Sequence, residues 1–248
     1  MILRYIIGLL PYLISAGICI WVGRLATTRK QDLASRALVG LAYSEALWVI
    51  AYILQIISHR IEMVLLWNNV QFLAASLLPV FYFGFALDYN YRQIPFKRFN
   101  WKYLFVIAGL MIAFIWSDSL HGLFRINPQV VQRELFYALE FENGALFGIY
   151  TIYAYTLIIL GTLFFVVKYI GAPRLFRVQV GTLLVGTVIP WVVSIITAIQ
   201  LIPMELHDFV PLTFGVSNLI IAWALFRHHL LDIVPIARDT LFENLADA

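Results

Sequence analysis

The residues best suited to chemistry are carboxyl, indole, phenol and amide side chains set inside long apolar runs. Glu45 lies roughly 12 Å of helix into one such run, with no Lys or Arg at its depth. Trp48, Tyr52 and Gln55 follow at three- and four-residue spacing, so the four side chains share one helical stripe. Ionisable groups deep in a membrane are costly and suggest a function. The stripe suits a small amphipathic ligand or a proton.

Further polar and aromatic residues lie at comparable depths in other apolar runs. The full set of candidate ligand-binding residues is Glu45, Trp48, Tyr52, Asn68, Gln71, Tyr150, Tyr153, Trp191 and Asn218. The alternative is that these groups only hydrogen-bond neighbouring helices, as polar residues in membrane spans often do. For Glu45 we expect either a neutral, hydrogen-bonded carboxyl or a charged ligand, and the sequence does not choose between them.

Histidines and acids also lie between the apolar runs on one side of the chain. They are His59, His121, His207, Asp118, Glu205 and Asp208. We take His121 and Asp208 as candidate outer-loop site residues, and an intramembrane zinc hydrolase stays an alternative function. No HExxH spacing supports it, and Cys19 is the only cysteine, so we predict no metal site. No serine–histidine–acid arrangement is evident, and we predict no catalytic residue.

The lysines exclude a retinal protein, which needs a Schiff-base lysine in its last span. All four lysines, Lys30, Lys97, Lys102 and Lys168, lie at the margins of apolar runs. We expect no cofactor, although an unknown small ligand remains possible. A proton or solute carrier is a less favoured alternative, because seven runs do not divide into equal repeats. Gly-rich phosphate-binding loops are absent, and no nucleic-acid partner is expected.

These residues must be positioned by a bundle of membrane helices. The chain is 62% hydrophobic and 12% charged, with a mean hydropathy of +0.86, whereas about a quarter of a soluble domain is charged. A membrane span needs about 20 apolar residues. Seven runs qualify: Tyr5–Gly23, Ala37–Ile57, Met63–Tyr89, Trp101–Ser117, Gly144–Lys168, Val178–Leu201 and Phe209–Phe226. They are apolar all round, so we predict an all-α integral membrane protein rather than a barrel.

The basic residues predict the orientation of the bundle. With the N-terminus outside, 13 Lys and Arg lie on the cytoplasmic side and 4 lie outside, which places the C-terminus in the cytoplasm. The longest outer loop runs from about Asp118 to Asn143, and its "RINPQ" is typical of a turn. Trp67, Trp101 and Trp116 lie near span ends, where we expect interfacial anchors.

Several segments resemble the seven-transmembrane N-terminal sensor region of bacterial and archaeal histidine kinases. They are "SDSLHGLF" (117–124), "GIYTIYAYTLIILG" (148–161), "RLFRVQVGTLLVGTVIPWV" (174–192) and the C-terminal block from His207 to Asp239. That block contains the family's Asp-x-x-Pro at Asp208 and Pro211, and its leucine–leucine–aspartate–x–x–proline–x–alanine–arginine exit from Leu230 to Arg238. The resemblance covers essentially the whole chain. It implies a sensor domain in a bacterial or archaeal cytoplasmic membrane.

The C-terminal segment is predicted to carry the output. We divide the chain into a seven-helix sensor domain (1–228) and a cytoplasmic linker with a signalling helix (229–248). The residues assigned to signal output are Arg227, Asp232, Pro235, Arg238 and Leu241. His228 and Asp232 lie one helical turn apart, but at the membrane edge we read them as solvated. Leu241 belongs to a weak coiled-coil pattern, which predicts a homodimer.

The chain ends inside this predicted helix, so we expect a missing output domain to follow it. The resemblance implies a kinase there, or a diguanylate cyclase in related proteins. A response regulator would be engaged only through that missing kinase domain, because no kinase motif occurs in these residues. The predicted function is therefore signal input: a small or membrane-borne ligand binds in the bundle, and the seventh helix passes the change to the output domain.

Overall fold

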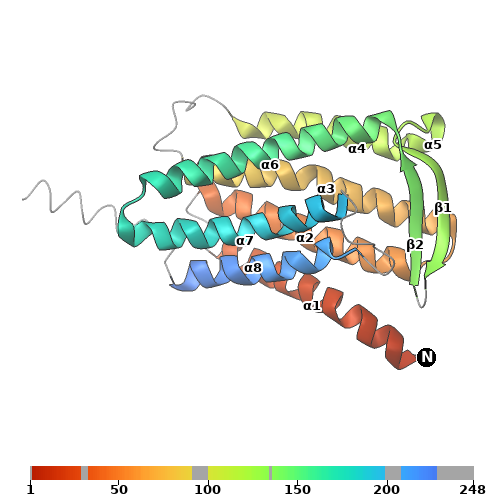
Figure 1. Ribbon diagram of the computed structural model, residues 1–248, viewed down its shortest axis with the longest axis horizontal. Coiled ribbons are helices and arrows are strands. Elements are labelled where there is room, and N and C mark those ends of the chain that lie inside the picture. The colour runs from red at the N-terminus through yellow and green to blue at the C-terminus, as the bar shows by residue number, and fades with distance from the viewer. Residues whose placement is uncertain (1, 29–32, 91–99, 134–135, 199–207, 228–248) are drawn as a thin grey trace, which may run out of the picture.

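The computed structural model describes residues 2–28, 33–90, 100–133, 136–198 and 208–227 (Figure 1). Its helices are α1 (Ile2–Thr27), α2 (Leu33–Ile57), α3 (Ile61–Tyr89), α4 (Leu104–Trp116), α5 (Asp118–His121), α6 (Ala145–Gly171), α7 (Arg174–Ala198) and α8 (Val210–Arg227). A short 3-10 turn, η1 (Trp101–Tyr103), precedes α4, and two strands, β1 (Arg125–Arg133) and β2 (Phe136–Asn143), precede α6.

Each of the seven predicted runs contains a helix. Within the described residues, five helices are long and apolar enough to cross a membrane, and two apolar helices, Trp101–Trp116 and Val210–Ala224, are shorter. The helical membrane bundle is thus confirmed in outline. The number of crossings and their orientation stay predictions.

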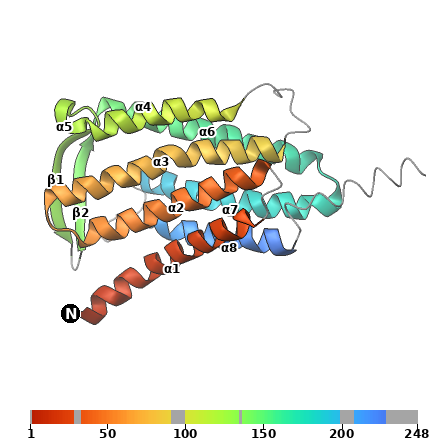
Figure 2. The ribbon, with the colours of Figure 1, turned by 180° about the vertical axis from the view of Figure 1, so that it is seen from behind.

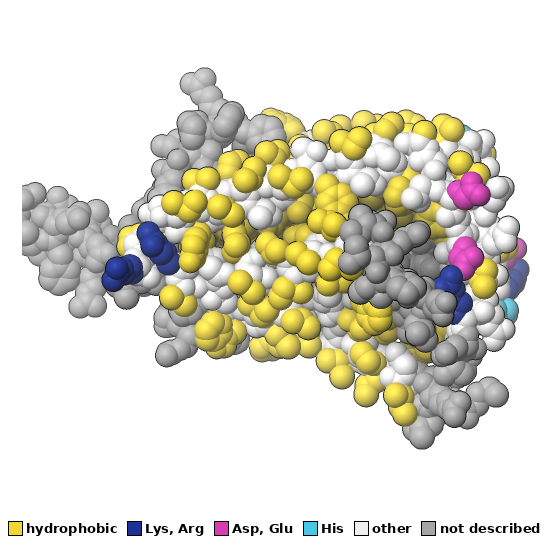
Figure 3. All heavy atoms as spheres, in the orientation of Figure 1, with side chains coloured by type: hydrophobic (Ala, Val, Ile, Leu, Met, Phe, Trp, Pro, Cys, Tyr) yellow, Lys and Arg dark blue, Asp and Glu magenta, His cyan; other side chains and the backbone are white. Residues whose placement is uncertain are grey.

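Six of the helices pack side by side as a closed ring. The order is α1, α2, α3, α6, α7 and α8, and α8 returns to pack against α1. α8 also contacts α2 across the ring, while α4 packs on α3 (Figures 1 and 2). Large apolar side chains cover the outer faces, as Figure 3 shows for one side. Such a surface suits lipid, in which helices satisfy their own backbone groups.

A β-hairpin, which the residue pattern did not predict, covers one end of the otherwise helical bundle. β1 and β2 pair antiparallel, with β2 packed on α2 and β1 on α3 (Figures 1 and 2). The "RINPQ" segment lies inside β1, where the register shifts between Ile126 and Gln129 and Asn127 has φ 49°. Turn-forming residues here produce a bulge, because bulges use the same left-handed backbone as many turns. We call this the hairpin end.

The segment that follows β2 lies beside the segment that precedes β1, just where α6 begins. Gly144 N donates to Phe124 O (3.0 Å) and Leu146 N donates to Leu123 O (3.0 Å). A Cβ at Gly144 would lie 2.0 Å from Leu123 O, so only glycine permits this approach. The hairpin base is therefore fixed tightly between α5 and α6.

Trp101 is not the interfacial anchor that its position predicts. Its side chain is buried, packs over Gly84, and donates from Nε1 to Asp88 Oδ2 (3.1 Å). A buried indole needs such an acceptor. Trp101 thus joins η1 to the far end of α3, whereas Trp116 is exposed as expected.

Candidate functional site

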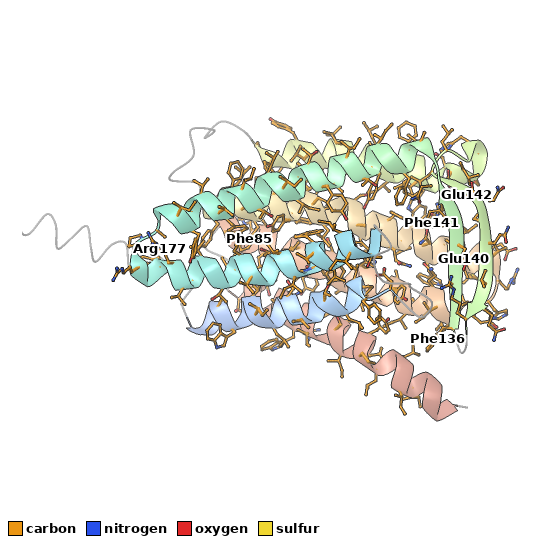
Figure 4. All side chains as sticks on the ribbon, viewed as in Figure 1. Phe85, Phe136, Glu140, Phe141, Glu142 and Arg177 are labelled. Carbon is orange, nitrogen blue, oxygen red and sulfur yellow. The ribbon has the colours of Figure 1, made fainter. Side chains whose placement is uncertain are left out.

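A cavity of about 280 Å³ lies between the hairpin and the bundle. Its bundle wall consists of Tyr52, Gln55 and Ile56 from α2, Asn68 and Gln71 from α3, and Asp208, which precedes α8. Its hairpin wall consists of Arg133, Phe136, Tyr137, Ala138, Leu139 and Glu140, among which Figure 4 labels Phe136 and Glu140 on β2. We call this the hairpin cavity.

Three buried amides form the floor that joins α2 to α3. Gln55 Oε1 accepts a hydrogen bond from Asn68 Nδ2 (3.2 Å) and a second from Gln71 Nε2. Buried amides are stable only when their groups are paired in this way. A ligand that enters the cavity meets amides whose orientation is already fixed.

Arg125 connects the hairpin base to this floor. Its Nη1 donates to Asn68 Oδ1 (2.7 Å), its Nη2 to Asn69 Oδ1 and to Ile115 O, and its Nε to Asp118 Oδ2 (3.2 Å). Asp118 also accepts from the backbone N–H groups of Phe124 (2.8 Å) and Arg125 (3.1 Å).

The Arg125–Asp118 pair is buried, with side chains 3% and 9% exposed. Burial lowers the pKa of Arg125, and the adjacent Asp118 opposes that shift. A buried pair of this kind depends on both partners, because removing one leaves an uncompensated charge. Through Asn68, the pair is part of the same hydrogen-bonded network as the cavity floor.

Asp208 ties the start of α8 to α1 and α2. Its backbone N donates to Tyr52 Oη (2.9 Å), its backbone O accepts from Tyr12 Oη (3.1 Å), and its Oδ1 accepts from Val210 N (2.9 Å). Burial raises the pKa of the Asp208 carboxyl to about 6, against the opposing bond from Val210 N. One residue therefore both lines the cavity and accepts a hydrogen bond from the first backbone N–H group of α8.

Ser15 of α1 hydrogen-bonds the backbone of α8 about one turn beyond Asp208. Its Oγ donates to Pro211 O (2.7 Å) and accepts from Gly215 N (3.0 Å). In a regular α-helix those two backbone groups would bond each other. A Cβ at Gly215 would lie 2.9 Å from Ser15 Cα, so the glycine permits the close packing of α1 on α8.

Glu45 pairs with Asn218 deeper in the bundle. Asn218 Nδ2 donates to Glu45 Oε2 (2.5 Å) and to Phe214 O (2.9 Å), with Cys19 Sγ at 3.4 Å. The residues of α8 that bond α1 and α2 are thus 211, 215 and 218, which share one helical face, and Asp208 makes the corresponding contacts just before the helix. Asn218 Oδ1 is buried and has no hydrogen-bond partner among the described residues.

The predicted ligand-binding residues separate into several places. Tyr52, Asn68 and Gln71 line the hairpin cavity with Asp208. Glu45, Trp48 and Asn218 lie deeper, where Trp48 packs edge-on against Phe214 (5.3 Å between ring centres). The remaining three lie apart: Tyr150 packs against Phe72 and Phe124, Tyr153 donates to Ser76 O, and Trp191 packs on Tyr82. The Nε1 atoms of Trp48 and Trp191 are buried without a partner among the described residues.

The two outer-loop candidates do not share a site. His121 lines a separate cavity of about 690 Å³ beside Asp118 and Arg125, whereas Asp208 lines the hairpin cavity. Within the described residues, no group of three His, Cys, Asp or Glu side chains could hold a metal ion. His207 and Glu205 lie outside the described residues, so their part in the zinc alternative stays untested.

Three residues that organise this site are absent from the predicted set: Tyr12, Arg125, and Ser15, whose depth in its apolar run matches that of Glu45. Arg125 follows directly after the "SDSLHGLF" segment, and a basic residue on the side with few basic residues was the available signal. The output residues Asp232, Pro235, Arg238 and Leu241 lie outside the described residues, and Arg227 is the last residue of α8.

Comparison with known proteins identifies the class of this bundle. Residues 11–235 match the family described as the N-terminal 7TM region of histidine kinase. No curated protein matches the chain. The match extends from α1 past the end of α8, and it agrees with the apolar helices. The chain is a multi-pass membrane sensory input region rather than a catalytic domain, and it belongs to the family of N-terminal seven-transmembrane regions of histidine kinases.

Proposed function

We propose that the hairpin cavity binds a small polar ligand and that α8 passes the resulting change to a cytoplasmic output domain, a histidine kinase. The observation that carries the proposal is the double role of Asp208, which lines the cavity and accepts a hydrogen bond from Val210 N at the start of α8. A ligand in the cavity would contact the residue that is bonded to the first turn of the output helix. The change would not have to travel through intermediate elements.

The cavity walls indicate what such a ligand offers. They present amides from Gln55, Asn68 and Gln71, the phenol of Tyr52 and the carboxyl of Asp208. These groups suit a small molecule with several hydrogen-bonding atoms, because pockets select orientation through a few placed polar groups. Phe136 and Tyr137 supply apolar contact from the hairpin side.

The path of transmission follows the inner face of α8. A ligand that bonds Tyr52 Oη competes with the bond from Asp208 N, and one that bonds the Asp208 carboxyl competes with the bond from Val210 N; in either case the first turn of α8 would shift relative to α1 and α2. The bridges at Ser15 and Glu45 would carry this shift along the helix as a small rotation or translation.

We propose that the hairpin end faces the outside of a bacterial or archaeal cytoplasmic membrane. The apolar outer faces support immersion in lipid, and the basic residues at the α6–α7 turn support a cytoplasmic position for that end (Figure 3). With this orientation the end of α8 at Arg227 would deliver the signal to the cytoplasm.

We also propose that the chain signals as a homodimer. This proposal rests on the coiled-coil pattern around Leu241, beyond α8. Crosslinking tests it directly. Leu241→Cys lies on the predicted coiled-coil face and should crosslink between subunits. Glu243→Cys lies off that face and should crosslink less. Equal crosslinking at both positions would contradict the predicted coiled-coil contact.

A filled cavity tests the proposed function. Ala138 is a half-buried residue of β2 in the cavity wall, so Ala138→Trp places an indole inside the cavity. In the full-length kinase, we expect this variant to change autophosphorylation severalfold and to make it insensitive to stimulus. Glu142→Trp, on the same strand but exposed and outside the cavity, is the matched control and should behave as wild type. Equal output from all three proteins would overturn the proposal.

A further inference from the structure

Another cavity opens on the outer surface between α7 and α8, toward the α6–α7 turn. It encloses about 640 Å³. Val178, Gly181 and Val185 line it from α7, and Leu219, Ile220 and Trp223 line it from α8. We call it the α7–α8 groove. Val178, Val185, Leu219 and Trp223 are each between 48% and 57% exposed, so the walls are open to whatever surrounds the bundle.

The charged side chains of α6, α7 and α8 have a single sign. The segments that form α6, α7 and α8 contain no Asp or Glu. Their basic residues are Lys168, Arg174, Arg177 and Arg227, and all lie at the same end of the bundle as the α6–α7 turn. We call this the basic end. Figure 3 shows basic side chains there, beyond the apolar surface.

Arg177 closes the groove at the basic end and is held in place. Its Nε donates to Ala172 O (2.9 Å) and its Nη2 to Ile170 O (3.4 Å), both at the end of α6 (Figure 4). A guanidinium has five N–H donors, so these bonds leave others for a further acceptor. The side chain is exposed, and Tyr169 lies beside it in the groove wall.

We infer that the α7–α8 groove binds an anionic phospholipid, with an acyl chain between the helices and the phosphate on Arg177. The apolar walls match a hydrocarbon chain, and basic groups at a membrane edge attract anionic headgroups. A second copy docked through the same face would bring further basic residues and no Asp or Glu from these helices to pair with them. The lipid therefore fits the charge pattern better than a partner subunit.

The position of the groove gives the bound lipid a consequence. It lies beside α8 beyond Asn218, past the described hydrogen bonds that tie this helix to α1 and α2. A lipid that contacts both walls would hold α8 against α7 at the end that leads to the output segment. This goes beyond the proposed function, because it needs no ligand in the hairpin cavity.

Native mass spectrometry of the purified chain tests the inference. The protein is titrated with phosphatidylglycerol or with phosphatidylcholine of the same acyl chains. We expect the wild type to bind phosphatidylglycerol about fivefold more tightly, the effect of one basic group near an anionic headgroup. Arg177→Gln should remove that preference. Arg174→Gln makes the same change of charge outside the groove wall and should retain most of it.

Val185→Trp fills the groove from an exposed position, so it tests the acyl-chain contact without disturbing the core. It should weaken binding of both lipids severalfold. Equal affinity for the two lipids in the wild type would overturn the inference, as would equal losses in the two arginine variants or unchanged binding in Val185→Trp. A Val185→Trp variant that loses dimers, in a protein without lipid preference, would instead assign the groove to a second copy.

Discussion

The two halves of α8 are held by different kinds of contact. Between Asp208 and Asn218 the helix is joined to α1 and α2 by directional hydrogen bonds, through Tyr12, Tyr52, Ser15 and Glu45. Beyond Asn218 it packs on α7 through apolar side chains such as Ile220, which lies against Gly186. Directional bonds fix one geometry, whereas apolar contacts allow helices to slide. In the proposed function, the first half of α8 would respond to the ligand and the second half would move with it.

The largest expected effect is at the hairpin base. Arg125→Met leaves Asp118 buried without its ion partner and Asn68 and Asn69 without their donor. We expect a loss of about 3–5 kcal/mol in the free energy of unfolding, as for other broken buried pairs. Arg133→Gln, which breaks the exposed pair with Glu140, should lose less than about 1 kcal/mol. Thermal unfolding in detergent compares the two, and similar losses would contradict the role of Arg125.

A smaller effect is expected at the centre of α8. Glu45→Leu removes the acceptor of Asn218 Nδ2 and should lower the free energy of unfolding by about 1–3 kcal/mol. Glu45→Gln keeps an acceptor oxygen and should lose less than half of that. Adding Asn218→Leu to Glu45→Leu should recover part of the loss, because the polar pair is then absent altogether. Strict additivity in this double-mutant cycle would mean that the two residues do not interact.

The Ser15 bridge should contribute less again. Ser15→Ala removes the hydroxyl between Pro211 O and Gly215 N, and we expect a loss of about 1 kcal/mol. Ser76→Ala is the matched control, since Ser76 Oγ only bonds Phe72 O within its own helix and is equally buried. Hydrogen exchange of the Gly215 amide should accelerate in Ser15→Ala alone. An unchanged exchange rate in Ser15→Ala would show that the Ser15 hydroxyl does not stabilise the Gly215 amide.

An effect as small as that of Ser15→Ala is the pH dependence from Asp208. Burial raises the pKa of its carboxyl from 3.8 to about 6, so the folded protein binds a proton there that the unfolded chain has lost between about pH 4 and pH 6. The free energy of unfolding should therefore fall as the pH rises through this window, by about 1 kcal/mol for a half-buried group. Asp208→Asn should remove this part of the pH dependence. An identical melting profile from pH 4 to pH 7 in both proteins would contradict it.

The inward stripe of α2 could be predicted from the sequence because helical periodicity is local. Glu45, Tyr52 and Gln55 are all buried, as their spacing requires. The hairpin could not be predicted in the same way. Its strands show only a weak alternation, and Asn127 reads as a turn when it forms a bulge.

The site network was beyond sequence reasoning for a different reason. Arg125 bonds Asn68, 57 positions earlier in the chain, and Ser15 bonds the backbone of α8, about 200 positions later. Such pairs follow from the order of helices in the ring, which the spacing within a segment does not encode. The coiled-coil contact at Leu241 and the output role of Pro235 remain predictions, because both residues lie outside the described residues.

The central claim is that the hairpin cavity controls the position of α8, and a distance measurement tests it most directly. Spin labels at Thr28→Cys on the C-terminal side of α1 and Val216→Cys on α8 both occupy exposed positions, and Cys19 is fully buried. Double electron–electron resonance then compares the labelled protein with its Ala138→Trp and Glu142→Trp derivatives. We predict a shift of about 1–2 Å in Ala138→Trp, the scale of helix movements in signalling proteins, and none in Glu142→Trp. Superimposable distances in all three proteins would contradict the account.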